Sequence, residues 1–189
     1  MTNYYDFGFM VCYSLFNACL IYFVTHLNIY RFRELLQLRV FMVLGFILSA
    51  AMLVGDIIEN QQLLELTKAP DADGIVLGTL SSLIYWTRIK WGAIFVVALM
   101  LCSGYTAYFR RVPTLLLPAI YAVAGIAGLV AISVPMARPM LETIGAPAIA
   151  LAWASSLIHA TVFLIRRHDE FPLPTNHRNR QTSPVEARA

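Results

Sequence analysis

Three polar residues, Asp56, Glu59 and Asn60, stand at the end of a long apolar stretch. Their spacing of i, i+3 and i+4 places all three on one face of a helix. Ionisable groups at membrane depth are costly, and they usually face a bundle interior, a partner or a wet cavity. Two carboxylates one turn apart are suited to proton handling, to general acid and base chemistry, or to binding a lipid headgroup. A serine two turns inward, Ser49, either extends this polar stripe or bonds to its own backbone.

Two cations, Arg88 and Lys90, begin a later apolar run and are expected at the same depth as the acidic face. Unpaired charge is costly in low dielectric, so one of them should pair with the carboxylates. Residues two apart on a helix point about 200° from each other, so only one of the two can do so. Arg88 and Lys90 both remain candidates for this pairing. The cluster is either an ion pair that fixes helix packing or a polar pocket open to the outer leaflet.

The two histidines of the apolar segments, His26 and His159, are expected at similar depths. Facing histidines inside a helix bundle can bind haem or a metal ion. Neither lies in a recognisable motif, so hydrogen-bonded or interfacial packing is the favoured interpretation, and no metal site or cofactor is predicted from them.

Composition identifies the class of protein. The 189 residues are 59% hydrophobic and 13% charged, whereas soluble domains are about a quarter charged. The chain contains no P-loop, no H-E-x-x-H, no G-x-S-x-G and no glycine-rich dinucleotide turn. The net charge of +3 is modest and localised, so no nucleic-acid partner is expected.

The apolar runs and their charged borders predict an all-α, polytopic transmembrane helical bundle with five spans. The predicted spans cover residues 7–27, 39–58, 88–109, 114–134 and 145–165. Pro147 suits the first turn of the last span. Residues 168–189 are rich in proline and polar groups, which predicts a disordered cytoplasmic tail after a membrane domain of residues 1–167.

Basic residues concentrate in alternate connections, which predicts an N-terminus outside and a C-terminus in the cytoplasm. They follow the first, third and fifth spans, as Arg31, Arg33, Arg39, Arg110, Arg111, Arg166, Arg167, Arg178, Arg180 and Arg188. We therefore expect a multi-pass protein of a bacterial inner (cytoplasmic) membrane.

The segment 75–86 is apolar but too short to span a bilayer alone. It is expected to lie along the outer interface as a short helix. The alternative is that it extends the third span into a helix of about 35 residues, or about 52 Å.

Small residues recur through the last two spans, for example Ala146, Ala150 and Ala154. Such spacing lets helices approach closely in lipid, either within one bundle or against other membrane subunits. The sequence favours a non-enzymatic accessory subunit, or a bundle that binds lipids or a partner through the charged site. The alternative is a small membrane enzyme or proton-coupled carrier that uses the same cluster.

Overall fold

The computed structural model describes residues 3–29, 35–68, 73–108, 115–137 and 139–170. Across these ranges it contains helices and no strands, which confirms the predicted all-α fold. The elements are α1 (Asn3–Leu27), α2 (Leu35–Lys68), α3 (Asp73–Tyr108), α4 (Leu116–Ser133), the 3-10 turn η2 (Pro135–Ala137), the π-helical turn η3 (Leu141–Gly145) and α5 (Ala146–Glu170). Most of the predicted tail, residues 171–189, lies outside the described residues.

Five helices of the described chain are long and apolar enough to cross a membrane. Their outward surfaces are apolar as well as their inward ones. Large hydrophobic side chains are exposed on α2 and α5, among them Val40, Ile47, Leu151 and Ile158. Helices that are hydrophobic all round belong in an apolar solvent. The fold is therefore that of a multi-pass membrane protein.

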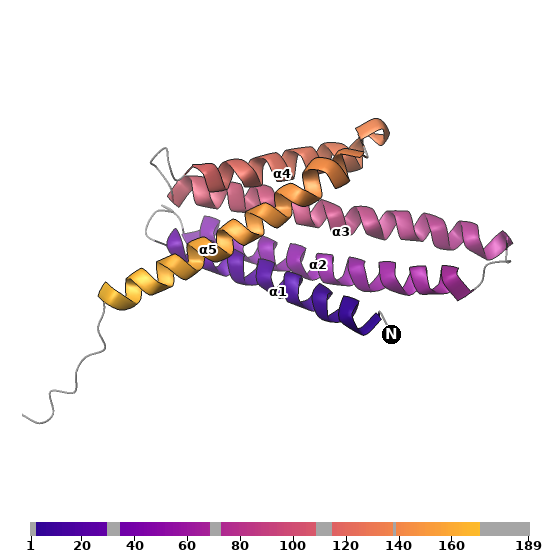
Figure 1. The fold of residues 1–189 in the computed structure, drawn as a ribbon, viewed down its shortest axis with the longest axis horizontal. Helices are drawn as coiled ribbons and strands as arrows, with labels where there is room; N and C mark the ends of the chain where they lie inside the picture. The colour runs from indigo at the N-terminus through magenta and orange to yellow at the C-terminus, as the bar shows by residue number, and fades with distance from the viewer. Residues whose placement is uncertain (1–2, 30–34, 69–72, 109–114, 138, 171–189) are drawn as a thin grey trace, which may run out of the picture.

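The helices form a bundle that α5 crosses obliquely, while α1, α2 and α3 run side by side (Figure 1). Helix α3 packs against both α2 and α4. Its side chains Phe95, Leu101 and Tyr105 are fully buried and form the centre of the core, together with Val24 of α1 and Tyr121 of α4.

The structure differs from the sequence prediction in the lengths of α2 and α3. Residues 75–86 are the first part of one continuous helix α3 and do not form a separate helix. No glycine or proline stands between Gly78 and Gly92, so nothing in the sequence ends the helix there. Helix α2 likewise continues past Ile58, because no glycine or proline stands between Ile58 and Pro70. The end of α2 and the start of α3 extend past the ends of α1 and α4 (Figure 1).

Two glycines allow α4 to approach α3 closely. A Cβ atom on Gly125 would lie 2.6 Å from Leu99 Cδ2, and one on Gly128 would meet the ring of Phe95. Helix α4 also packs against α5, where Ala152 and Ser156 are buried. Close approach through small residues is a usual way for helices to associate in lipid.

Candidate binding site

One ammonium group joins the two carboxylates of α2. The Nζ atom of Lys90 lies 3.0 Å from Asp56 Oδ1 and 2.6 Å from Glu59 Oε2. The side chains of Lys90 and Asp56 are each 11% exposed, and that of Glu59 is 17% exposed. Charges in so little contact with solvent need partners, because the cost of desolvation is large. The α2–α3 contact supplies those partners.

Lys90 pairs with the acidic face, and Arg88 is exposed on another side of α3. Lys90, and not Arg88, faces the carboxylates because α3 approaches α2 closely at Gly55. A Cβ atom there would lie 3.1 Å from Lys90 Cβ and 3.4 Å from Lys90 Cα, so the absence of a side chain brings the two backbones together at this level. Arg88, about 200° away around the helix, turns from α2.

A phenol from α1 completes the environment of Asp56. The hydroxyl of Tyr13 donates a hydrogen bond to Asp56 Oδ2, and its ring stacks on Trp153 of α5 with 5.9 Å between the ring centroids. Asn60 donates from Nδ2 to the sulfur of Met10 at 3.1 Å. Three helices thus contribute hydrogen-bonding groups to one polar cluster, made of Tyr13, Asp56, Glu59, Asn60 and Lys90.

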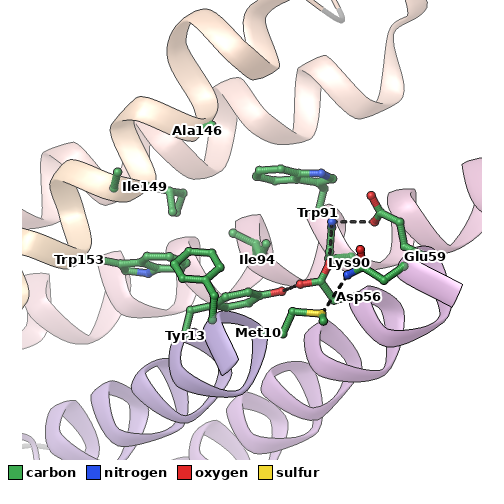
Figure 2. Close-up of a pocket in the computed structure, with 13 residues that line it drawn as sticks. Met10, Tyr13, Asp56, Glu59, Lys90, Trp91, Ile94, Ala146, Ile149 and Trp153 are labelled. Atoms are coloured by element: carbon green, nitrogen blue, oxygen red, sulfur yellow. Dashed lines mark hydrogen bonds and ion pairs between the residues drawn. The ribbon is translucent and has the colours of Figure 1, made fainter. Parts of the chain in front are cut away.

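This polar cluster forms one side of a cavity of about 420 Å³ that lies among α1, α2, α3 and α5 (Figure 2). Pockets for small ligands are commonly about 300–1,000 Å³. Every contributing helix presents residues spaced as one helical face. They are Phe9, Met10 and Tyr13 of α1, Asp56, Glu59 and Asn60 of α2, Lys90, Trp91 and Ile94 of α3, and Ala146, Ile149, Ala150 and Trp153 of α5.

The cavity is polar on one side and apolar on the other. The apolar side is built largely by α5, where Ala146 and Ala150 leave room that larger side chains would fill. The backbones of α1 and α5 are not closely packed in the described chain, and large aromatic side chains such as Tyr13 and Trp153 join the two helices. Phe9 is 67% exposed and Ala150 is exposed, so the cavity reaches the surface between α1 and α5.

Arg88 contributes to a different feature. It lines a second cavity of about 310 Å³ between α3, α4 and η3, together with Thr87 and Glu142. Trp91 borders both cavities. Ser49 does not extend the polar stripe, because its hydroxyl donates to the Gly45 carbonyl one turn earlier, at 2.9 Å.

The histidines lie away from the polar cluster. His26 is exposed and stacks on Tyr22, while His159 is half-buried among Phe23, Tyr105 and Tyr108. Within the described ranges, no group of three or more His, Cys, Asp or Glu side chains is arranged to hold a metal ion. Haem or metal binding by His26 and His159 stays the less favoured alternative to packing.

Sequence reasoning missed Tyr13 and Trp153. A phenol hydroxyl in the middle of an apolar span needs a partner, so Tyr13 carried a usable signal. Trp153 shares a helical face with Ala146, Ile149 and Ala150 at i+7, i+4 and i+3. The small residues of that face on their own predict only close helix packing.

Comparison with protein-family models, curated proteins and solved structures finds no match. The fold and the site therefore define the class: a multi-pass helical membrane protein with a ligand-sized cavity beside a buried ion pair.

Proposed function

We propose that this integral membrane protein binds an amphiphilic ligand, such as a membrane lipid, in the cavity among α1, α2, α3 and α5. The supporting observation is the placement of the buried Asp56–Lys90–Glu59 cluster on one side of that cavity, opposite an apolar side. An amphiphile matches both sides at once, because its head can bond to the charged groups while its tail contacts α5.

The opening supports a ligand that arrives from the membrane. The cavity reaches the surface between α1 and α5, two helices that also carry exposed apolar side chains such as Leu15 and Leu151. Such surfaces contact acyl chains in a membrane protein. With the orientation expected from the basic residues, the site lies towards the outer leaflet of a bacterial inner membrane.

A binding role fits the cluster better than catalysis. Both oxygens of Asp56 are already engaged, one by Tyr13 and the other by Lys90. A general base needs access to the proton that it removes, so this carboxylate is poorly placed for that task. The protein can serve on its own or as an accessory subunit of a membrane complex.

One observation favours a second candidate, a proton-coupled carrier or small enzyme. Tyr13, Asp56, Lys90 and Glu59 form an unbroken chain of polar contacts from α1 through α2 to α3. Chains of this kind inside membranes can relay protons.

The test is lipid retention with the cavity filled. Ala150→Phe places a ring in the cavity, and Ala154→Phe places the same ring on an exposed site of the same helix that does not line it. We expect native mass spectrometry of purified protein to show a bound lipid that is lost in the first variant and kept in the second. Equal retention by both variants would contradict the proposal.

The same preparations separate the two candidates. Tyr13→Phe breaks the polar chain but leaves the cavity walls in place. Lipid retention should therefore persist if the protein is a binding bundle. Proton uptake into liposomes by the unaltered protein, abolished by Tyr13→Phe, would instead establish the carrier.

A further inference from the structure

We infer that the ligand carries a primary ammonium group, which Glu59 and Asn60 bind at the polar side of the cavity. This inference rests on the proposed function, since it identifies the head of the ligand that the cavity takes. It follows from the charge of the cavity and from a count of the hydrogen-bonding atoms left available there.

The charge of the cavity favours a cation. Among the described residues that line it, the formally charged ones are Asp56, Glu59 and Lys90, which is two negative charges and one positive charge. The formal charge is thus −1 in a place where the side chains are 11–17% exposed. A net charge in low dielectric is costly, and a bound cation removes that cost.

Several hydrogen-bonding atoms of the polar cluster already have partners and are therefore not available to a ligand. Asp56 accepts from Tyr13 at one oxygen and from Lys90 at the other. The Lys90 ammonium contacts both carboxylates, and it also lies 5.6 Å from the centroid of the Trp91 ring. Tyr13, Asp56 and Lys90 therefore already have partners within the polar cluster, as the dashed lines of Figure 2 show.

Two acceptors are left over. Glu59 contacts Lys90 through Oε2 and Asn60 uses Nδ2 on Met10, so Glu59 Oε1 and Asn60 Oδ1 have no partner among the described residues. Both are acceptors, which N–H donors match and which phosphate or carboxylate oxygens would oppose. A primary ammonium offers three such donors, whereas a quaternary ammonium offers none.

The ammonium can be the headgroup of a lipid or part of a soluble amine. The apolar side formed by Phe9, Ile149 and Trp153 favours the lipid, because acyl chains would cover it. Both sources share the same contact with Glu59, and the experiment separates them.

The experiment compares three dioleoyl lipids that differ only in the headgroup: phosphatidylethanolamine, phosphatidylcholine and phosphatidylglycerol. Retention is measured by native mass spectrometry of the full-length protein. We expect the ethanolamine lipid to be retained about tenfold better than the other two, as one charge-assisted hydrogen bond would give. Glu59→Gln should remove this preference, and the exposed Glu65→Gln on the same helix should keep it.

A second variant covers the case in which Glu59→Gln does not fold. Asn60→Leu removes the other free acceptor and keeps a side chain of the same branched shape, and it should reduce the preference several-fold. Displacement of the ethanolamine lipid by soluble glycerophosphoethanolamine would assign the ammonium to a soluble amine. Resistance to displacement would assign it to the lipid.

Equal retention of the three lipids, or a preference for phosphatidylglycerol, would overturn the inference. If Ala150→Phe still reduces retention in that case, the binding function survives and only the headgroup assignment fails. If Ala150→Phe and Ala154→Phe retain the same lipid equally, the proposed function itself fails.

Discussion

The Lys90 ammonium lies 3.0 Å from Asp56 Oδ1 although the two residues belong to different helices, and each side chain is only 11% exposed. The pair fixes α3 against α2 at the level of Gly55 and also forms the polar side of the cavity. The same two residues therefore hold α2 and α3 together and line the cavity that we propose binds a ligand. A loss of binding in a variant of either residue has to be compared with its loss of stability.

Replacing Lys90 by methionine should destabilise the fold by about 3–5 kcal/mol, because two buried carboxylates then lose their cation. Unfolding in mixed detergent micelles measures the change. Arg88→Met is the matched control, since Arg88 is exposed two residues earlier on the same helix, and it should stay within about 0.5 kcal/mol of the unaltered protein. A larger loss at Arg88 than at Lys90 would refute the assigned pairing.

The Asp56–Lys90 pair should show coupling in a double-mutant cycle. Asp56→Asn and Lys90→Met together should cost less than the sum of the single changes, by about 0.5–3 kcal/mol, because the double variant leaves neither charge of the pair alone. The same unfolding assay supplies all four stabilities. Additive effects would mean that the two side chains do not interact in the membrane.

Tyr13→Phe tests the hydrogen bond to Asp56 without removing the ring that stacks on Trp153. A hydrogen bond to a charged group contributes about 1.5–3 kcal/mol, so a loss of that size is expected. Tyr22→Phe provides the comparison, because Tyr22 is 60% exposed on the same helix. Equal stabilities of these two variants would argue against the α1–α2 contact.

The sequence predicted local relationships well. Helix periodicity alone places Asp56, Glu59 and Asn60 on one face, and the apolar runs with their charged borders predict five spans. It also predicts that only one of Arg88 and Lys90 can face α2. The sequence could not show that Lys90, and not Arg88, forms the pair, because this depends on how closely α3 approaches Gly55 of α2.

Contacts between helices far apart in the sequence could not be predicted from local patterns. Tyr13 and Trp153 meet Asp56 only because α5 crosses the bundle and lies over α1 (Figure 1). No local pattern encodes that crossing. The ends of α2 and α3 differ from the predicted span borders for a simpler reason, because charged residues interrupt the apolar runs where the helices continue unbroken.

Ser156 tests the packing of α5 against the rest of the bundle. Its buried hydroxyl lies 2.8 Å from the Tyr121 hydroxyl and accepts a hydrogen bond from Tyr105 at 3.3 Å. Ser156→Ala removes a partner of a buried phenol and should cost about 1–3 kcal/mol. The neighbouring Ser155, half-buried, supplies a control as Ser155→Ala, for which little change is expected in thermal unfolding. A neutral Ser156→Ala would contradict the packing described for α4 and α5.

Gly125→Ala tests the close approach of α4 to α3. The added Cβ atom would lie 2.6 Å from Leu99 Cδ2 and 3.1 Å from the Phe95 carbonyl oxygen, so overpacking should cost about 1–3 kcal/mol. At Gly8 of α1 a Cβ atom has nothing within 4 Å. Gly8→Ala should therefore be neutral or stabilising by up to about 1 kcal/mol in the same assay. Tolerance at Gly125 and damage at Gly8 would be the opposite of what this packing requires.

The most direct test of the binding function is an experimental structure of the protein in a lipid nanodisc, for example with a bound antibody fragment for cryo-electron microscopy. We expect elongated density between α1 and α5 that enters the cavity, with its polar end beside Glu59 and Asn60 and its tail along Ile149 and Trp153. A cavity closed by protein side chains, with Trp153 packed against Trp91 and no added density, would contradict the account.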